Sequence, residues 1–222
     1  MAYGLHWEWR GFGILPASVR ETIEDLPAQF PTPGTVKDEY LWAPGCRINL
    51  KLRSGEAKSL KFKRLRDSDR ATGLELWEER AEEDYEFPVS PGVVVGLGAA
   101  LGVRANQPPG SLDREALLQA LQRADSRIKV LAVDKVRRAR LYPLAAGRLI
   151  VEVAELTSPQ LVTSVGIEDD LGLTDASAAD RVEAAKRSVA AAVRQLGLDG
   201  ALTRLNYVDA VTCWAEGGTL SC

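Results

Sequence analysis

The stretch RINLKLR at residues 47–53 is followed closely by SLKFKR at residues 59–64. Apolar and polar residues alternate in both, and this period of two predicts two β-strands, each with one apolar and one basic face. The basic faces carry Lys51, Arg53, Lys61 and Lys63. An antiparallel sheet with one face in solvent would show the same alternation. The pattern therefore leaves open whether the charged face is solvated or enclosed.

The alternation recurs along the chain, which predicts a sheet of many short strands. Residues 5–15 (LHWEWRGFGIL) carry Glu8 and Arg10 on one face and two tryptophans on the other. The tryptophans are expected in the core. The remaining predicted strands are 35–42, 73–79, 128–142, 148–156 and 161–168. A turn is expected at residues 67–72, before the strand at 73–79.

Helices are expected between and after these strands. Residues 16–26 begin at a proline, and residues 176–196 place valines at helical spacing with charges opposite. The middle, about residues 88–126, is expected to be a helical insertion in which Ser111 can cap a helix. The order favours one α+β domain over residues 1–222, rich in antiparallel pairs. The tail at 203–222 stays unassigned.

The charges are sorted along the chain, and this sorting favours an enclosed charged face. Residues 47–66 contain eight lysines and arginines and a single acidic residue, Glu56. Helices such as 176–196 are available to cover an apolar outer face. A charged interior is costly unless a ligand or counter-charges fill it. Lysines and arginines suit a polyanion, and carboxylates beside them suit a divalent cation that bridges it.

Composition narrows the function further. The 222 residues are 45% hydrophobic and 27% charged, with a formal net charge of -3. Such a chain has no overall basic field, so neither a nucleic-acid partner nor a membrane partner is expected. The longest apolar run, residues 91–103, is too short to span a membrane. The first residues lack the features of a secretory signal.

The histidine and cysteine content excludes several kinds of site. His6 is the single histidine, so sites that need two histidines are excluded, and a lone histidine is expected to be structural. The three cysteines form no CxxC motif and indicate reduced thiols. A cytoplasmic location is therefore expected.

The order of the charged motifs resembles the CYTH superfamily, the triphosphate tunnel metalloenzymes. That family opens with an ExExK strand. Basic, lysine-bearing and acidic strands follow, and after a helical insertion come K-x-R and E-x-E strands. The matching segments here, spread over roughly residues 5–196, are His6-Trp7-Glu8-Trp9-Arg10, Lys51-Leu52-Arg53, Lys61-Phe62-Lys63, Glu75, Lys135-Val136-Arg137, Glu152 and Gly166-Ile167-Glu168. His6 and Gly166 stand where the family has glutamates, and Arg10 stands where it has lysine.

The resemblance implies a closed antiparallel β-barrel, a tunnel of two strand halves with helices packed outside. It implies a Mg²⁺- or Mn²⁺-dependent hydrolase of inorganic tripolyphosphate, thiamine triphosphate or a nucleoside triphosphate. The carboxylates it assigns are Glu8 and Glu168 to the metal, with Asp169 and Asp170 as competitors, and Glu8, Glu75 and Glu152 to catalysis. The substrate-binding residues it assigns are Arg10, Lys51, Arg53, Lys61, Lys63, Lys135 and Arg137.

Three other functions remain open at this stage. The missing carboxylates favour a module that binds polyphosphate or nucleotide without hydrolysis. The resemblance also leaves room for a class IV-type adenylate cyclase. RNA binding on the basic strands would be marked by steep salt dependence. The partner in the main hypothesis is a small triphosphate or polyphosphate, and a homodimer is left open.

Overall fold

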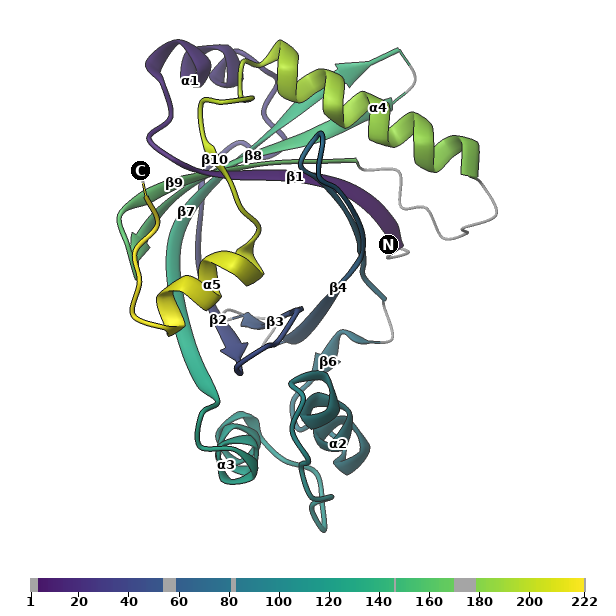
Figure 1. The fold of residues 1–222 in the computed structure, drawn as a ribbon, viewed down its shortest axis with the longest axis vertical. Coiled ribbons are helices and arrows are strands. Elements are labelled where there is room, and N and C mark those ends of the chain that lie inside the picture. The colour runs from purple at the N-terminus through teal and green to yellow at the C-terminus, as the bar shows by residue number, and fades with distance from the viewer. Residues whose placement is uncertain (1–3, 54–58, 81–82, 146, 170–178, 222) are drawn as a thin grey trace.

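The computed structural model describes residues 4–53, 59–80, 83–145, 147–169 and 179–221. Within these residues eight antiparallel strands close into a barrel, seen as a ring in Figure 1. Around the ring the strands are β1 (Leu5–Gly13), β5 (Leu74–Glu78), β4 (Ser59–Asp69), β3 (Ile48–Arg53), β2 (Gly34–Trp42), β7 (Lys129–Leu144), β8 (Gly147–Ser158) and β9 (Val162–Asp169). The pairing of β1 with β9 closes the barrel. The predicted closed barrel is confirmed.

The barrel consists of two strand halves, as expected. Strands β1 to β5 precede the helical insertion and strands β7 to β9 follow it. The halves meet at the β2–β7 pair and at the β1–β9 pair. Two short strands are added, β6 (Tyr85–Glu86) on β4 and β10 (Thr203–Arg204) on β1. The turn predicted at 67–72 is wrong in its extent, because β4 runs to Asp69 by pairing with β5 past a β-bulge.

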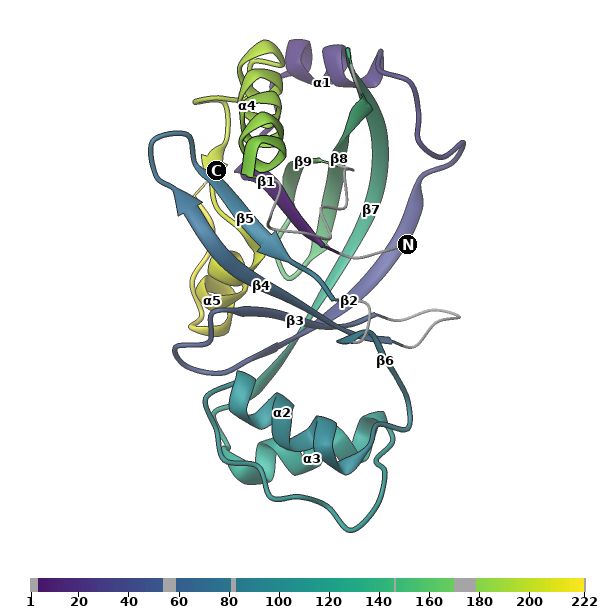
Figure 2. The same cartoon turned by 90° about the vertical axis from the view of Figure 1, so that its right-hand side faces the viewer.

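Two helices cover one side of the outer surface. Helix α1 (Ala17–Glu24) and helix α4 (Ala179–Gln195) lie side by side over β1, β8 and β9 (Figures 1 and 2). Trp7 and Trp9 point outward into this layer and are 2% and 0% exposed. The start of the predicted helix at 176–178 lies outside the described residues.

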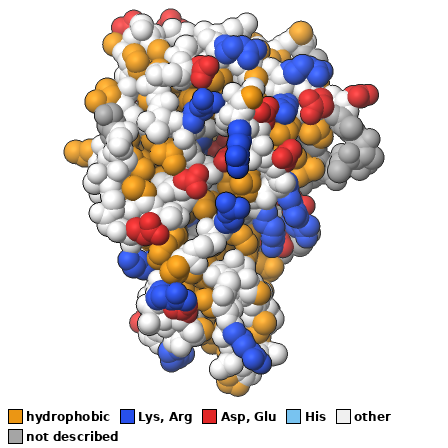
Figure 3. Space-filling view, in the orientation of Figure 1, with side chains coloured by type: hydrophobic (Ala, Val, Ile, Leu, Met, Phe, Trp, Pro, Cys, Tyr) orange, Lys and Arg blue, Asp and Glu red, His pale blue; other side chains and the backbone are white. Residues whose placement is uncertain are grey.

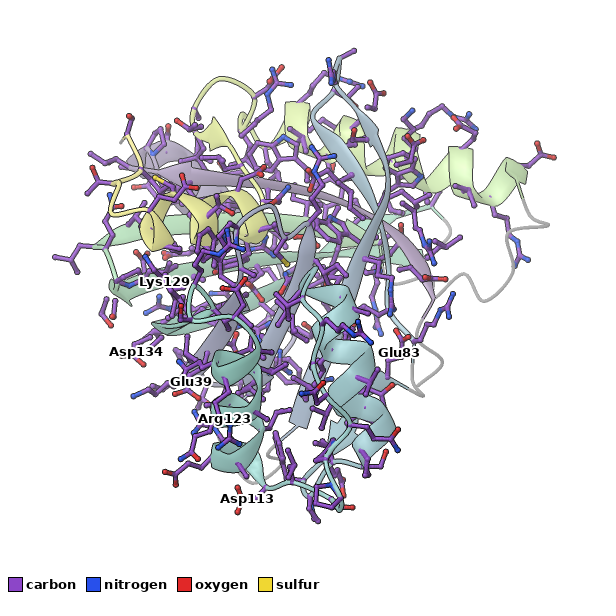
Figure 4. The ribbon with its side chains drawn as sticks, turned by 60° about the horizontal axis from the view of Figure 1, so that its bottom comes forward. Glu39, Glu83, Asp113, Arg123, Lys129 and Asp134 are labelled. Atoms are coloured by element: carbon purple, nitrogen blue, oxygen red, sulfur yellow. The ribbon has the colours of Figure 1, made fainter. Side chains whose placement is uncertain are left out.

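The insertion forms a helical lobe against another side of the barrel (Figure 2). Helix α2 (Pro91–Ala100) and helix α3 (Arg114–Ala124) pack on apolar side chains of β3 and β4 such as Leu50 and Leu60. The cap of α3 is Asp113, whose Oδ1 accepts from the Ala116 N–H at 2.8 Å. The prediction of Ser111 was wrong, because Asp113 directly precedes the first turn. Figure 4 shows Asp113 at α3. The same view labels Glu39 of β2, whose carboxylate pairs with Arg114 at the start of α3.

The unassigned tail belongs to the barrel. After β10, helix α5 (Tyr207–Ala215) lies across one end of the ring and packs into the lumen (Figures 1 and 2). The Phe12 ring meets the Tyr207 and Trp214 rings edge-on, with centroids 5.3 and 6.2 Å apart. Tyr40 stacks on Tyr207 at 5.4 Å. We call this packed part of the lumen the aromatic end.

The inward faces of the strands change from charged to apolar over a few residues. On β1, Arg10 is followed two residues later by the buried Phe12, and on β7, Lys135 lies two residues from the buried Val133. Inward-facing residues on one strand are two apart, so each pair marks the same boundary. The lumen is therefore apolar at the aromatic end and charged beyond it.

None of the helices in the described segments combines the length and apolarity that a membrane crossing requires.

Candidate functional site

A cavity of about 190 Å³ lies in the charged part of the lumen, and we call it the charged chamber. It is more than ten times the ~10–15 Å³ that a single water needs. Its lining consists of Glu8, Arg10, Asn49, Lys51, Arg53, Lys61, Phe62, Lys63, Glu79, Lys135, Arg137, Glu152, Glu168 and Tyr207. All of the site residues predicted from the sequence are among them except Glu75. The chamber has seven basic and four acidic residues, so its lining is net positive.

The face of the molecule drawn in Figure 3 does not share this sorting of charge. On the face seen in Figure 3, basic and acidic side chains are interspersed rather than gathered into one basic patch. This face therefore offers no single basic patch to a polyanion.

Asp38 on β2 is a member of the site that the sequence analysis missed. Its carboxylate is fully buried, and its Oδ2 lies 3.1 Å from Lys135 Nζ and 3.8 Å from Lys51 Nζ. Arg53 Nε lies 3.6 Å from Oδ1. Burial works to raise the pKa of Asp38, but these cations outweigh it and lower the pKa. Asp38 thus holds three predicted phosphate-binding side chains together. Its signal in the sequence is a carboxylate that shares a strand face with Tyr40 and Trp42.

Lys51 is a cation of the chamber whose pKa lies near neutral pH. Burial lowers the pKa of Lys51 to about 7 against the attraction of Asp38. The charges of Arg53 and Lys135 lower it further. An anion bound beside Lys51 would favour its protonated form, so anion binding and proton uptake are coupled at this residue.

A cluster of His6, Glu8 and Glu168 forms on β1 and β9. Glu8 and Glu168 are direct cross-strand partners, and His6 Nε2 lies 3.9 Å from an oxygen of each. Lys63 reaches the same carboxylates, with Nζ 2.5 Å from Glu8 Oε2 and 3.8 Å from Glu168 Oε2. Burial would raise the pKa of Glu8, but Lys63 and Arg10 hold that pKa well below its usual value. Glu79, also missed by the sequence analysis, lies 3.4 Å from the same ammonium.

The donor set of this cluster fits a divalent cation. One ligand atom each from His6, Glu8 and Glu168 lies within 4.8 Å of the others. The buried Nε2 of His6 has no hydrogen-bond partner among the described residues. An imidazole nitrogen with two carboxylate oxygens suits Mn²⁺ and is compatible with Mg²⁺, provided that the Lys63 ammonium moves aside. His6, which the sequence analysis expected to be structural, lies beside two carboxylates.

Arg10 lies along the inner wall of the barrel and reaches from β1 over Gly166 of β9. Its Nε donates to Glu8 Oε1 at 2.7 Å, and its Nη1 donates to Ser164 Oγ at 3.0 Å. Nη1 also lies 3.5 Å from Glu152 Oε1, whose other oxygen pairs with Arg137. Burial opposes the ionisation of Glu152, but the two guanidinium groups hold its pKa at about 2. Glu152 is therefore ionised at any physiological pH.

Glu75 lies apart from the other predicted catalytic residues. It lines a second cavity of about 210 Å³ beside α5, and Arg10 belongs to the linings of both cavities. Asn206 Nδ2 donates to Glu75 Oε1 at 2.7 Å, and Trp77 Nε1 donates to Oε2 at 3.1 Å. Burial raises the pKa of Glu75. The structure thus places this residue behind Arg10 as seen from the charged chamber.

The two competitors for the role of Glu168 have different outcomes. Asp169 points to the other face of β9, where its Oδ2 accepts from the Trp7 N–H at 2.7 Å. That contact turns Asp169 away from the charged chamber. Asp170 lies outside the described residues, as does Glu56.

Comparisons with known proteins support the fold. Neither protein-family models nor curated proteins give a match to this chain. Among solved structures, it is similar to a conserved hypothetical protein from Pyrococcus furiosus, with a TM-score of 0.50 and 18% identity over 86% of this chain and 90% of that one. A protein from Pyrococcus horikoshii gives a TM-score of 0.47 and 15% identity over 93% of this chain and 98% of that one. A Bacillus halodurans protein described as a "putative adenylate cyclase" gives a TM-score of 0.43 and 11% identity over 91% of this chain and 94% of that one. At these identities the likeness concerns the fold.

Proposed function

We propose that this protein is a divalent-metal-dependent hydrolase of a triphosphate, with inorganic tripolyphosphate, thiamine triphosphate and nucleoside triphosphates as the candidate substrates. The observation that supports this most strongly is the charged chamber. It combines seven basic residues with two carboxylates, Glu8 and Glu168, and these two carboxylates also form a cluster with the imidazole of His6. A polyanion with a bridging divalent cation is the ligand class that meets both requirements.

The basic residues would bind the phosphate oxygens. Lys51, Arg53 and Lys135 converge on Asp38, whose single negative charge leaves them with a net positive charge. Arginine binds phosphate oxygens through a planar fork of donors, whereas lysine acts as a point charge. Lys61 and Arg137 also line the chamber. A chain of phosphates would therefore meet cations from β3, β4 and β7.

The cluster of His6, Glu8 and Glu168 would hold the divalent cation. When bound, Mg²⁺ or Mn²⁺ supplies a Lewis acid that neutralises charge on the phosphate oxygens. Lys63 must leave its contact with Glu8 for this, and it would then be free to bind a phosphate oxygen itself. Most of the rate enhancement would come from positioning and charge neutralisation.

Hydrolysis requires a water held in line with the terminal phosphorus. The water oxygen forms the new bond to the terminal phosphorus, and the bridging P–O bond breaks. The terminal phosphate is released as orthophosphate, the diphosphate part of the substrate is the leaving group, and the proton of the water passes to a phosphate oxygen and then to solvent. Glu79 and Glu152 are the lining carboxylates outside the cation cluster. Since the pKa of Glu152 is about 2, this residue would orient the water rather than retain its proton. Glu75 could take part only from the second cavity.

A specific observation favours a second candidate function, that of a module that binds polyphosphate without hydrolysing it. Glu8 contacts both Lys63 and Arg10, and Glu152 contacts Arg10 and Arg137. Carboxylates that are already neutralised by fixed cations have less need of a metal ion. Such a module would bind tripolyphosphate equally well with and without a divalent cation.

The deciding experiment measures phosphate release from tripolyphosphate, ATP and thiamine triphosphate, with Mg²⁺, with Mn²⁺ and with a chelator. Wild type is compared with Glu8→Ala. The matched control is Glu155→Ala, which removes a carboxylate from the outer side of the barrel, where it pairs with Arg20. Cyclic AMP is assayed in parallel.

We expect metal-dependent phosphate release that Glu8→Ala abolishes and Glu155→Ala preserves. Absence of release, with metal-independent tripolyphosphate binding that Lys61→Ala removes, would establish the binding module instead. Formation of cyclic AMP would identify a cyclase. If the protein neither releases phosphate nor binds tripolyphosphate, the proposal as a whole is contradicted.

A further inference from the structure

Arg10 is a permanent positive charge inside the barrel, where it lines both cavities. Its side chain is 9% exposed and contacts Glu8, Glu152 and Ser164. Its guanidinium also lies 4.9 Å from the centre of the Tyr207 ring. Burial opposes this charge, but the two carboxylates more than offset it. The guanidinium is thus a built component of the site and not a mobile surface group.

The guanidinium occupies the space that a missing side chain leaves on β9. Gly166 is the direct partner of Arg10 on one side and of Glu152 on the other. A Cβ atom at position 166 would lie 2.5 Å from Arg10 Nη2 and 2.8 Å from Cζ, closer than side chains pack. Glycine therefore allows Arg10 to reach across β9 to Glu152 on β8.

Arg10 also occupies one of the two carboxylate oxygens of Glu8. Oε1 of Glu8 accepts from Arg10, whereas Oε2 faces His6 and Lys63. Oε2 of Glu8 thus becomes available to a cation at His6 and Glu168 when the Lys63 ammonium, 2.5 Å away, moves aside. Two-metal phosphoryl-transfer sites place their ions ~3.5–4 Å apart and share carboxylates between them. Here the other oxygen of Glu8, together with Glu152, is already bound to a guanidinium.

We infer that Arg10, seated over Gly166, is the fixed second cation of this site, so the charged chamber takes up one divalent ion at His6, Glu8 and Glu168 and not two. This inference rests on the proposed function, because it needs that cluster to bind a metal ion. Arg10 then supplies the positive charge that a second metal ion would supply, on the side of Glu8 that faces Glu152. Unlike a metal ion, this charge is part of the chain and does not exchange with solvent.

The test counts metal ions on the full-length chain. Mn²⁺ is titrated into the protein, and free and bound ion are measured by electron paramagnetic resonance and by calorimetry. The double variant Arg10→Met with Gly166→Glu removes the fixed cation and adds a carboxylate between Glu8 and Glu152. The matched control, Arg10→Met with Gly166→Ala, removes the same cation and adds no ligand. Circular dichroism verifies the fold of each.

Wild type is expected to bind one Mn²⁺ ion with an uncoupled spectrum, and the control Arg10→Met with Gly166→Ala is also expected to bind one. The variant Arg10→Met with Gly166→Glu is expected to bind two Mn²⁺ ions that are magnetically coupled. A wild type that binds two coupled ions would overturn the inference, and this result does not depend on the folding of any variant. A folded double variant with the added carboxylate that still binds one ion would overturn it as well. A wild type that binds none would instead remove the metal from the proposed function, and the inference with it.

Discussion

The two ends of one lumen are built on the same strands but use their interior differently. At the aromatic end, Phe12 and Trp42 meet Tyr207 and Trp214 of α5 and leave a packed core. In the charged chamber, the next inward residues along the same strands are ionised and surround a cavity of about 190 Å³. Apolar side chains gain free energy by excluding water, whereas like charges cannot close on one another. The hollow is therefore a consequence of which residues line it.

The difference predicts that the aromatic end contributes stability and the charged chamber contributes binding. Phe12 and Tyr207 are 0% and 6% exposed, and burial of aromatic rings is among the larger favourable terms in folding. Buried ion pairs contribute little net stability, because desolvation of both partners offsets their attraction. Variants at the two ends should then separate stability from affinity.

The largest effect is expected for Phe12→Ala at the aromatic end. Loss of a fully buried ring that meets Tyr207 and Trp214 should lower the free energy of unfolding by about 4 kcal/mol. The affinity of the folded protein for tripolyphosphate should remain unchanged. Denaturant unfolding and calorimetry measure the two quantities. The control is Ile14→Ala on the residue after β1, which is 76% exposed and should cost under about 0.5 kcal/mol. A large loss of affinity in Phe12→Ala would contradict the division.

Asp38→Asn in the charged chamber comes next. An intact buried ion pair adds little net stability, but removal of one partner leaves uncompensated buried charge, so the free energy of unfolding should fall by about 3 kcal/mol. The variant leaves Lys51, Arg53 and Lys135 without their buried counter-charge. A bound anion can replace that charge, so tripolyphosphate should raise the unfolding temperature more in this variant than in wild type. Asp134→Asn, on the neighbouring strand β7, is the control. An equal ligand effect in Asp38→Asn and wild type would mean that Asp38 does not balance the anion site.

A smaller effect follows from the pKa of about 7 at Lys51. Below pH 7 this lysine is protonated and anion affinity is full. Above pH 7 the proton must be taken up on binding, so the dissociation constant of tripolyphosphate should rise by up to about tenfold per pH unit. Calorimetry from pH 6 to 9 with a chelator measures this rise. Lys51→Arg keeps its charge, and the ratio of the two proteins cancels titration of the ligand itself. Parallel pH profiles would exclude Lys51 as the titrating group.

The smallest effect is expected outside the lumen, at the cap of α3. Asp113→Ala removes the acceptor of the Ala116 N–H and should cost about 1 kcal/mol. Neither the aromatic end nor the charged chamber touches this residue, so affinity for tripolyphosphate should not change. Thermal unfolding and calorimetry check both points. A change in affinity would show that the helical lobe is coupled to the chamber.

The strand faces could be predicted from the sequence because alternation is a local property. The charged set on β3 and β4 needed only the period of two and the sorting of charge between residues 47 and 66. Closure of the barrel was expected from a resemblance, and the β1–β9 register confirms it. The roles assigned to individual residues remain predictions.

What the sequence did not show depends on contacts between distant segments. Asp38 was missed because its three cations come from β3 and β7. His6 was interpreted as structural because Glu168, its neighbour in space, lies far along the chain. The pattern of α5 is that of any core helix, and its position inside the lumen is set by β10 pairing with β1. Glu75 pairs in register with Glu8 but lines the second cavity, and the strand pattern does not distinguish the two cavities.

The closure of the barrel constrains the order in which its elements can fold. The first strand finds its second partner only when residues 162–169 are available, and α5 can enter the lumen only after that. During synthesis, β1 therefore waits for most of the chain with one edge unpaired, which is the condition that favours aggregation of nascent chains. Contacts so distant in sequence are slow to form. We expect that chaperones which shield strand edges would increase the yield of this protein during expression.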